Sequence, residues 1–464
     1  MKKLHAILFL TICFSLFTSL CEGQYTTLLN FNGTNGDNPY GSLTLIGGKL
    51  YGMTYIGGAN SDGCIFSIDT DGAGYKDLFD FNGTTGFEPE GSLIDSGGRL
   101  FGMTSYGGIN GNGCIFSIDT DGTGYKKLFD FDGVNGDQPD GSLILNGNKL
   151  YGMTALGDGG DGNIFSIDTD GSRFRDIYDF IGVEGELPYA DLTLIGNRLF
   201  GMTRSGGSFN YGCVFSVDTG GNGYKVLLNF NRANGATSFG SLTVLGNRLF
   251  GMTRGGGAGD SGCVFSIDTA GNGYKDLLDF NGANGAFPTC NLTVYHGVLY
   301  GLTEAGGINK DGCLFSIDTD GSGYNKLYDF NSPTGMYPLG SLTLSNNVFY
   351  GMTYMGGMNN EGVVFSFKVA DLGINNLSAP TNSVTVYPNP GSGIFNIVIA
   401  SETRQSYPII EVYNMLGEKV YSQSIIHSSS FIVDLSNQPA GVYLYRVLAE
   451  DGSLLGEGKL ILQK

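Results

Sequence analysis

Short runs of alternating apolar and polar residues, separated by glycine-rich turns, fill most of the chain. In one representative stretch the predicted strands cover residues 91–94, Arg99–Thr104, Cys114–Asp119 and Tyr125–Phe131. Ser-Gly-Gly joins the first two strands, and a loop containing Asp-Gly, which favours hairpin turns, joins the last two. A longer Gly-rich loop over residues 106–113 joins the middle pair. The pattern predicts a unit of four short antiparallel strands.

An aromatic residue followed by Gly-Met-Thr, or Gly-Leu-Thr in one copy, marks the second strand of each unit. The glycines are Gly52, Gly102, Gly152, Gly201, Gly251, Gly301 and Gly351, at intervals of 50, 50, 49, 50, 50 and 50 residues. A period near 50 residues is the length that four short strands and their turns need. The spacing indicates one supersecondary unit copied in tandem.

The phase of the repeats relative to the chain ends predicts how the array closes. Third strands are marked by Phe66, Phe116, Phe165, Phe215, Phe265, Phe315 and Phe365, and fourth strands by Phe31, Phe81, Phe131, Phe180, Phe230, Phe280 and Phe330. The repeats therefore open with a lone fourth strand over residues 26–31 and end with three strands near Val369. Joining these ends completes a last blade, so we expect an all-β, closed seven-bladed β-propeller rather than an open solenoid.

The two kinds of connection divide the expected propeller into two faces. Tight hairpins join strands one to two and three to four on one face, and longer connections lie on the other. Binding residues on rigid scaffolds are found most often on long, variable loops. We therefore expect the long-loop face to be the binding surface.

The first 23 residues have the features of a secretory signal peptide. Met1-Lys2-Lys3 precedes an apolar run from Ala6 to Leu20, and Gly23 favours cleavage before Gln24. Cys21 leaves a lipoprotein as the alternative. The net charge of −19 makes nucleic acid and anionic membrane surfaces poor partners.

Most cysteines occupy one repeat position. Cys64, Cys114, Cys213, Cys263 and Cys313 all begin the third strand, where Asn163 and Val363 stand in the other copies. Equivalent positions in different blades are too far apart for a disulfide. We expect small buried residues and no disulfide framework, with Cys290 also unpaired.

The repeat unit resembles two known repeat families. Its second-strand aromatic residue and Gly-Gly pair are similar in layout to a kelch repeat, although the chain has no Trp. The combination of Leu-Tyr/Phe-Gly-Met-Thr, Gly-Gly and Phe-Ser-Ile-Asp more closely resembles the secreted bacterial GloVer tandem repeats, over residues 24–370. This resemblance implies an extracellular repeat architecture and no established activity.

The periodicity stops after Ala370, and residues 371–382 are predicted to be a linker. Residues 383–464 alternate apolar runs with turns, which predicts a small antiparallel β-sandwich. Their motifs, at the C-terminus, resemble the type A sorting domain of the type IX secretion system of Bacteroidetes-type bacteria. The motif residues are Tyr387, Pro388, Asn389, Pro390, Gly417, Gly441 and Tyr443. The resemblance implies transport across the outer membrane by that secretion machinery.

The sequence gives little support for a metal site or for a catalytic triad. The recurrent Asp-Thr-Asp-Gly pairs two carboxylates, as in Asp69 and Asp71, but Ca²⁺ needs six to eight oxygen ligands and the hairpin turn explains the motif better. His296 is the one histidine in the repeats, too few for a His-based metal site or a Ser-His-Asp triad. We expect no metal and no cofactor.

A carboxylate pair for glycoside hydrolysis is an open alternative. The candidates on predicted loops or strand ends are Glu88, Glu90, Asp140, Glu184, Glu186 and Glu304. Their spacing selects no pair.

Function in a repeat protein is best sought where the copies differ. The residue after each Gly-x-Thr varies strongly and falls on the long-loop face, and the candidate binding residues there are Tyr55, Arg204, Arg254, Glu304 and Tyr354. Aromatic residues also occur in the inter-blade loops, at Tyr40, Phe87, Tyr189, Phe239, Phe287 and Tyr337. Tyr, Phe and Arg on one concave face suit sugar stacking or protein contact. Packing of the loops is the other interpretation of the aromatic residues.

These observations favour a monomeric, secreted or cell-surface binding propeller without enzymatic activity, whose ligand is a glycan or a protein. An extracellular carbohydrate-active enzyme with a carboxylate pair near the propeller channel is the alternative. A purely structural role in the cell envelope is a third possibility.

Overall fold

The computed structural model describes residues 24–157, 159–369, 384–399, 409–414, 418–424, 430–448 and 454–463. The chain divides into two compact units between Val369 and Ala370. The predicted signal peptide, the predicted linker and the sorting-motif residue Gly417 lie outside the described residues.

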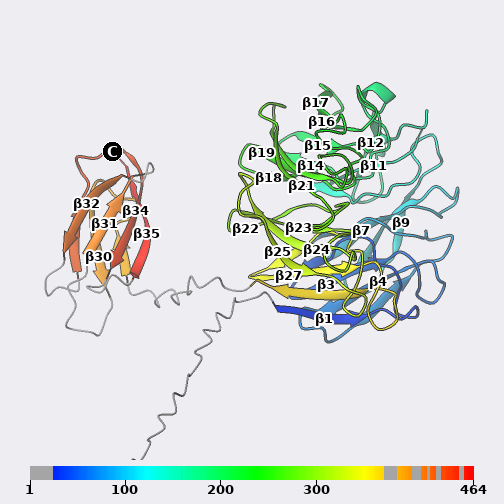
Figure 1. Ribbon diagram of the computed structural model, residues 1–464, viewed down its shortest axis with the longest axis horizontal. Helices are drawn as coiled ribbons and strands as arrows, with labels where there is room; N and C mark the ends of the chain where they lie inside the picture. Colours follow the sequence, from blue (N-terminus) through cyan, green and yellow to red (C-terminus); the bar gives the residue numbers. More distant parts are fainter. Residues whose placement is uncertain are drawn as a thin grey trace, which may run out of the picture. The chain divides into compact units, whose positions relative to one another are not determined.

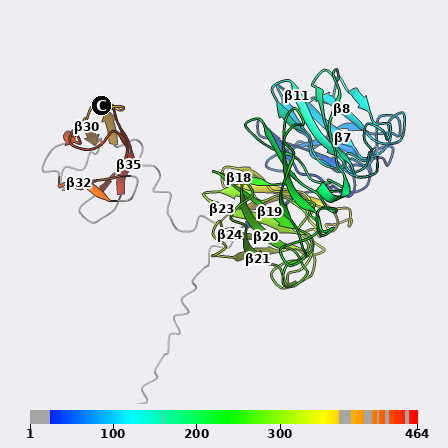
Figure 2. The ribbon, with the colours of Figure 1, turned by 90° about the horizontal axis from the view of Figure 1, so that it is seen from above.

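The first unit contains seven four-stranded antiparallel sheets, which follow one another in order of sequence colour (Figures 1 and 2). The first strands are β2 (Thr44–Ile46), β6 (Ile94–Ser96), β10 (Ile144–Asn146), β14 (Thr193–Ile195), β18 (Thr243–Leu245), β22 (Thr293–Tyr295) and β26 (Thr343–Ser345). The second strands are β3 (Lys49–Thr54), β7 (Arg99–Thr104), β11 (Lys149–Thr154), β15 (Arg198–Met202), β19 (Arg248–Thr253), β23 (Val298–Thr303) and β27 (Val348–Thr353).

The third strands are β4 (Cys64–Asp69), β8 (Cys114–Asp119), β12 (Asn163–Asp168), β16 (Cys213–Asp218), β20 (Cys263–Asp268), β24 (Cys313–Asp318) and β28 (Val363–Lys368). The fourth strands are β5 (Lys76–Asp80), β9 (Lys126–Asp130), β13 (Arg175–Asp179), β17 (Lys225–Asn229), β21 (Lys275–Asp279), β25 (Asn325–Asp329) and, for the last sheet, β1 (Gln24–Asn30). A short 3₁₀ turn, η1 (Gly182–Glu184), lies in one inter-blade loop.

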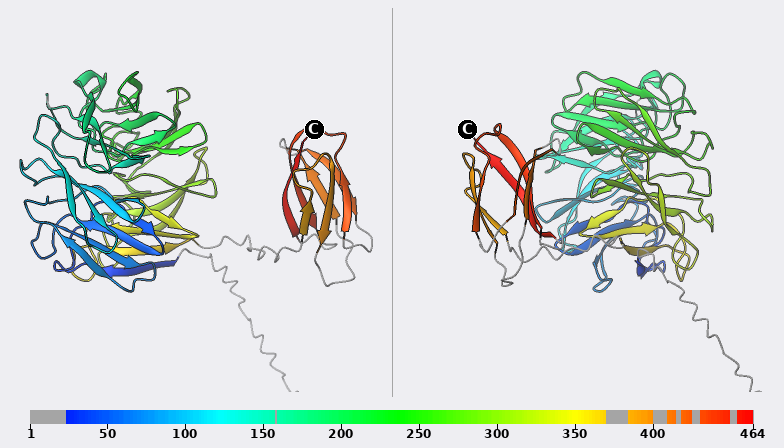
Figure 3. Two further views of the ribbon diagram at one scale, coloured as in Figure 1. Left: turned by 180° about the vertical axis from the view of Figure 1, so that it is seen from behind. Right: turned by 60° about the vertical axis from the view of Figure 1, so that its left-hand side comes forward.

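The N-terminal strand closes the ring, as the phase of the repeats predicts. β1 pairs antiparallel with β28, with Gln24 opposite Lys368 and Asn30 opposite Val363. Figure 3 shows dark-blue β1 beside the yellow strands of the last sheet. The closed seven-bladed propeller is therefore confirmed, and the first and last described repeat strands protect each other's edges.

A second closure runs around the central channel. Just ahead of each first strand, one backbone N–H donates to a side-chain oxygen of the next blade, at 2.6–2.8 Å in six of the seven bonds. The donors and acceptors in turn are Ser42, Ser92, Ser142, Asp191, Ser241, Asn291 and Ser341, and the amide of Ser341 returns to Ser42. We call these seven residues the channel ring.

The residue before each member of the channel ring brings neighbouring backbones into close contact. A Cβ on Gly340 would lie 2.1 Å from the carbonyl oxygen of Gly41, and one on Gly41 would lie 2.3 Å from that of Gly91. Ala190 and Cys290 replace this glycine in two blades. The predicted first strand began at Gly91, whereas β6 begins at Ile94, because Ser92 and Leu93 bond to neighbouring blades before the ladder starts.

The Gly-Met-Thr motif belongs to the scaffold. A Cβ on Gly52 would lie 2.7 Å from the ring of Phe66 on the adjacent third strand, and Phe66 is completely buried. Glycine therefore makes room for the phenylalanine that fills each blade. The six described cysteines are free and buried, in agreement with the prediction of small apolar residues.

The C-terminal unit consists of two sheets that share one core. β29 (Val384–Tyr387), β30 (Ile394–Ile399) and β33 (Ser430–Asp434) form one sheet, and β32 (Lys419–Ser424), β31 (Ile409–Tyr413), β34 (Gly441–Leu448) and β35 (Leu454–Leu462) form the other. Phe395 and Val433 of the first sheet and Val412, Tyr445 and Leu460 of the second belong to a single buried cluster.

Two of the predicted sorting-motif residues hold this unit together. Asn389 donates to the carbonyl of Lys459 at 2.6 Å and accepts from the amide of Ile461 at 2.8 Å, which ties the segment after β29 to β35. The buried Tyr443 hydroxyl donates to the carbonyl of Pro439 at 2.7 Å. These contacts give Asn389 and Tyr443 structural roles within the sandwich.

The channel ring predicts the effect of removing one hydroxyl. In Ser341→Ala the amide of Asn291 loses its acceptor, so we expect the free energy of unfolding to fall by about 1–3 kcal/mol. Urea unfolding of residues 24–464 measures the change. Ser345→Ala, in β26 of the same blade but outside the channel ring, serves as the control, and equal effects of the two substitutions would contradict the importance of the ring.

Candidate functional site

One side chain from each blade surrounds the mouth of the channel on the long-loop face. It belongs to the residue two positions before each member of the channel ring, and the set comprises Tyr40, Glu90, Asp140, Tyr189, Phe239, Thr289 and Leu339. With the channel ring these residues line a narrow cavity of about 60 Å³. We call them the mouth residues.

An unusual backbone conformation precedes each mouth residue. The residue two positions earlier has a left-handed conformation in every blade, with φ between 51° and 57°, and the set comprises Asn38, Glu88, Gln138, Leu187, Thr237, Phe287 and Tyr337. In six blades a proline separates this residue from the mouth residue, the exception being Ser238. Because proline fixes its own φ, it restricts the path of the backbone that leads into the mouth residue in those six blades.

The left-handed residues are also bonded to the positions predicted as binding residues. The amide of Arg204 donates to the carbonyl of Leu187 at 3.1 Å, and that of Tyr354 to the carbonyl of Tyr337 at 3.0 Å. Equivalent bonds join Tyr55 to Asn38, Ser105 to Glu88, Ala155 to Gln138, Arg254 to Thr237 and Glu304 to Phe287. Two variable positions are thus joined in every blade.

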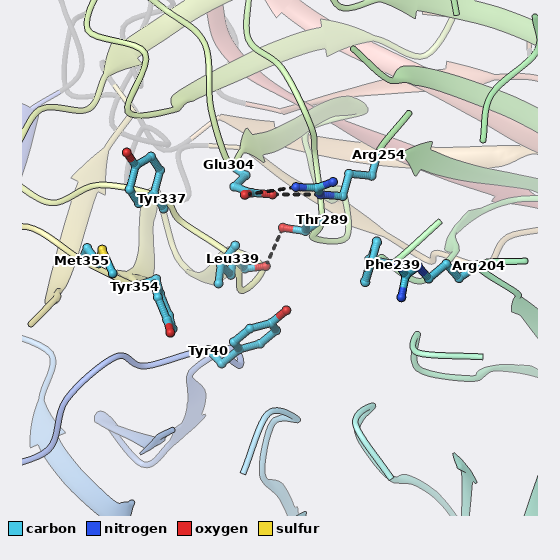
Figure 4. A pocket seen from close by; sticks show the side chains of 10 residues that line it. All are labelled: Tyr40, Arg204, Phe239, Arg254, Thr289, Glu304, Tyr337, Leu339, Tyr354 and Met355. Atoms are coloured by element: carbon cyan, nitrogen blue, oxygen red, sulfur yellow. Dashed lines mark hydrogen bonds and ion pairs between the residues drawn. The ribbon is translucent and has the colours of Figure 1, made fainter. Parts of the chain in front are cut away.

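A larger cavity of about 460 Å³ opens beside the mouth (Figure 4). Its lining includes four of the five predicted binding residues, Arg204, Arg254, Glu304 and Tyr354. Tyr55 is not part of the lining, and its hydroxyl donates to Glu88 Oε2 at 2.7 Å. Sequence reasoning did not identify Thr289, Leu339 and Met355, which complete the wall together with Tyr40, Phe239 and Tyr337.

The two arginines of the cavity differ in their electrostatic environment. Arg254 Nε lies 3.0 Å from Glu304 Oε2, and its Nη2 lies 3.3 Å from Oε1, so Glu304 holds and neutralises this guanidinium. Arg204 instead lies over the adjacent rings of Tyr189 and Phe239, with its Cζ 5.3 and 5.1 Å from their centroids. Among the described residues, no carboxylate forms an ion pair with Arg204.

Some loop aromatic residues pack against one another. The Tyr40 ring contacts Tyr354 edge-to-face with centroids 6.1 Å apart, and Tyr55 at 6.3 Å, while Phe87 stacks on Tyr106 at 5.6 Å. Tyr40 and Tyr354 nevertheless also line the cavity. Packing and cavity formation are therefore compatible for these two residues.

Two acidic mouth residues, Glu90 and Asp140, lie in adjacent blades. Burial, together with repulsion from Asp140 and Glu88, raises the pKa of Glu90 to about 8. Burial also raises the pKa of Asp140 to about 7, an effect that Ser105 partly offsets and Asp137 reinforces. Protonated carboxyl groups can therefore exist here near neutral pH.

The aspartates of the Asp-Thr-Asp-Gly turns, on the opposite face, bond to backbone amides and to cationic side chains. Asp71 Oδ1 accepts from the amide of Ala73 at 2.9 Å, and Asp168 pairs with Lys149 at 2.7 Å and with Arg173 at 2.6 Å. Over the described part of the chain, no group of three or more His, Cys, Asp or Glu side chains is arranged to hold a metal ion.

The raised pKa values predict a pH-dependent stability. Since folding keeps Glu90 and Asp140 protonated above their ordinary pKa values of 4.5 and 3.8, the folded protein binds more protons than the unfolded chain between about pH 4 and 8. Their contribution to stability is present at low pH and is lost as the pH rises through 7 and 8. We expect calorimetry from pH 5 to 9 to show this loss, reduced in Glu90→Gln by roughly 1–3 °C of melting temperature. Identical pH profiles of the two proteins would contradict the assignment.

Comparison with known proteins agrees with this architecture. The Gloeobacter/Verrucomicrobia repeat matches residues 14–215 and 195–396, and the secretion system C-terminal sorting domain matches residues 385–463. No curated protein matches the chain. Among the described residues, no helix is long and apolar enough to cross a membrane.

Two solved structures illustrate the range of similar folds. The extracellular domain assigned to a hybrid two component system from B. thetaiotaomicron is 14% identical, with a TM-score of 0.48, over 95% of this chain and 57% of that one. A fungal alcohol oxidase of the AA5 family, in complex with copper, is 12% identical, with a TM-score of 0.47, over 96% of this chain and 99% of that one. The chain therefore spans less than two thirds of the bacterial domain.

The sorting domain indicates interaction with the secretion machinery and a secreted or cell-surface location. The repeats cover most of the rest of the chain, including all seven sheets. The chain belongs to the Gloeobacter/Verrucomicrobia repeat family and carries a C-terminal sorting domain of the type IX secretion system.

Proposed function

We propose that this protein is a secreted or cell-surface binding propeller that recognises its ligand at the channel mouth, through the 460 Å³ cavity. The observation that carries the proposal is the convergence of three variable sets of side chains at one place. Tyr40, Arg204 and Tyr337, one from each set, line the same cavity. A cavity of this volume falls within the usual range of small-molecule sites.

The contrast between scaffold and cavity supports a binding role. The channel ring keeps one hydrogen-bond geometry in all blades, while the mouth residues include tyrosine, phenylalanine, acids, threonine and leucine. Structural demands are the same in every blade, so they do not account for this variety. Contact with a particular ligand would account for it.

The chemistry of the wall suits a glycan. Phe239 and the tyrosines offer flat apolar surfaces with hydroxyl groups at their ends, and Arg254 with Glu304 offers fixed donors and acceptors. Sugars present both apolar C–H faces and hydroxyl groups, which matches this combination. A protein ligand would make the same kind of contacts through an exposed side chain or loop.

Glycan hydrolysis is a second candidate, favoured by the adjacent acids Glu90 and Asp140. A carboxyl group with a pKa near 7 can donate a proton at neutral pH, as a general acid must. Release of reducing ends from a bound oligosaccharide, abolished in Asp140→Asn, would support this candidate. Binding without release would favour the non-enzymatic role.

The left-handed backbone of Tyr337 offers a clean test of binding. Tyr337→Gly removes a cavity wall but relieves the strain of φ 57°, so we expect stability to stay within about 1 kcal/mol of the wild type. We expect its binding to a glycan microarray to fall about tenfold or more, because a large aromatic contact is lost. The protein tested is residues 24–464.

Asn346→Gly is the matched control. Asn346 has φ 55° in a hairpin on the opposite face, so the same kind of substitution leaves the cavity intact. Wild-type protein that retains neither a glycan nor a surface protein would overturn the proposed function. Equal binding by wild type and Tyr337→Gly would move the ligand away from this cavity.

A further inference from the structure

We infer that the ligand of this cavity is a sugar that carries a carboxylate, of the uronic acid class, and that Arg204 binds the carboxylate. This inference rests on the proposed function and names its ligand class. It follows from the charge of the cavity, the way Arg204 is held, and the left-handed residues that surround the mouth.

Arg204 is positioned as a free cation. Its guanidinium lies over both Tyr189 and Phe239, whose own centroids are 5.5 Å apart, and these contacts favour its direction without neutralising its charge. The neighbouring Arg254 also contacts Phe239, at 5.8 Å, but forms a bidentate ion pair with Glu304. Two arginines in equivalent positions of adjacent blades thus differ in the one property that anion binding requires.

The charge balance of the cavity is unusual for this protein. The charged side chains of its lining are Arg204, Arg254 and Glu304, which leaves one positive charge, whereas the whole chain carries −19. An acidic surface disfavours the general binding of polyanions. A single, local carboxylate is therefore better matched to this site than a densely charged polymer. Guanidinium groups form strong, often two-pronged hydrogen bonds with carboxylates.

The wall around Arg204 selects a sugar over a peptide. Phe239 and Tyr40 present ring surfaces to the same cavity, and Glu304 keeps acceptor oxygens close to it. Peptides are most often recognised along a free strand edge, in a helix groove or in a polyproline groove. None of the ten residues that line the cavity lies in a strand, so a peptide could not extend a sheet edge there.

The left-handed residues give independent support for a selective site. At other left-handed positions of the repeat, such as those of Asn346 and Ser61, glycine occurs in some copies, for example Gly97 and Gly111. The seven left-handed residues beneath the mouth include no glycine, although glycine would adopt this backbone without strain. Side chains such as Tyr337 are therefore kept at a cost in backbone strain, which is typical of functional sites.

Calorimetric titration tests the inference with matched acidic and neutral probes. The probes are trimers of galacturonate, mannuronate and glucuronate, together with their methyl esters, which keep the sugar ring but lose the charge. We expect residues 24–464 to bind at least one acidic trimer and to bind its ester at least about tenfold more weakly. We also expect Arg204→Gln to lower affinity for the acid by roughly 10- to 100-fold, to the level of the ester.

Arg173→Gly is the control for charge. It also removes one positive charge, but on the opposite face, at a left-handed position where other blades have glycine. We expect it to leave affinity unchanged. Thermal unfolding of each variant checks folding, and Arg204→Lys, which keeps the charge but not the forked geometry, should retain part of the affinity even if Arg204→Gln is unstable.

The outcomes separate this inference from the proposed function. Equal binding of acid and ester, or loss of affinity in Arg173→Gly as large as in Arg204→Gln, overturns the role of the carboxylate but leaves sugar binding intact. Binding of a neutral glycan or a protein without any uronate overturns the inference alone. A protein that binds no glycan and no surface protein overturns both.

Discussion

Close contact between backbones around the central channel is the constraint on which the rest of the molecule depends. In five blades a glycine lies against the carbonyl of the next blade, and in all seven blades an amide donates to a side chain of the next blade. Pairing of β1 with β28 closes the same circle at its outer edge. Because both closures fix the start of every innermost strand, the mouth residues one position before the small residue are fixed as well. The site is thus a direct consequence of how the ring closes.

Each repeat combines a backbone that is the same in every blade with side chains that vary from blade to blade. The left-handed residue and the proline after it set the path of the inter-blade loop, while the residue after Gly-x-Thr is bonded to that loop through its backbone. Backbone bonds carry no information about side chains, so both positions can vary without disturbing the frame. This separation explains how residues as different as Arg204, Glu304 and Tyr354 can occupy one structural position.

The fold could be predicted from the sequence because its signals are periodic. The spacing from Gly52 to Gly351 indicated four strands per unit, and the unpaired strand at residues 26–31 indicated closure. The cavity was predicted only in part, because its wall comes from several blades. Nothing near Tyr55 in the sequence shows that its hydroxyl bonds to Glu88, and Arg204 cannot be told from Arg254 until Glu304, fifty residues away, is in place. The variability just before the Gly-Ser position of the repeat, which is Cys290-Asn291 in one blade, was the signal that could have found Thr289 and Leu339.

The ionisable side chains at the mouth and in the cavity would favour one orientation of a bound ligand. Glu90 and Asp140 line the narrow cavity at the mouth, and Arg204 lines the larger cavity beside it. Burial of the acids favours their protonated forms, in which they donate hydrogen bonds to hydroxyl groups, whereas the Arg204 guanidinium offers donors alone. A ligand with hydroxyl groups at one end and an anionic group at the other would be bound in a single orientation. Ionisation of the acids at high pH would remove those donors and repel the anion, so recognition and stability should weaken over the same pH range.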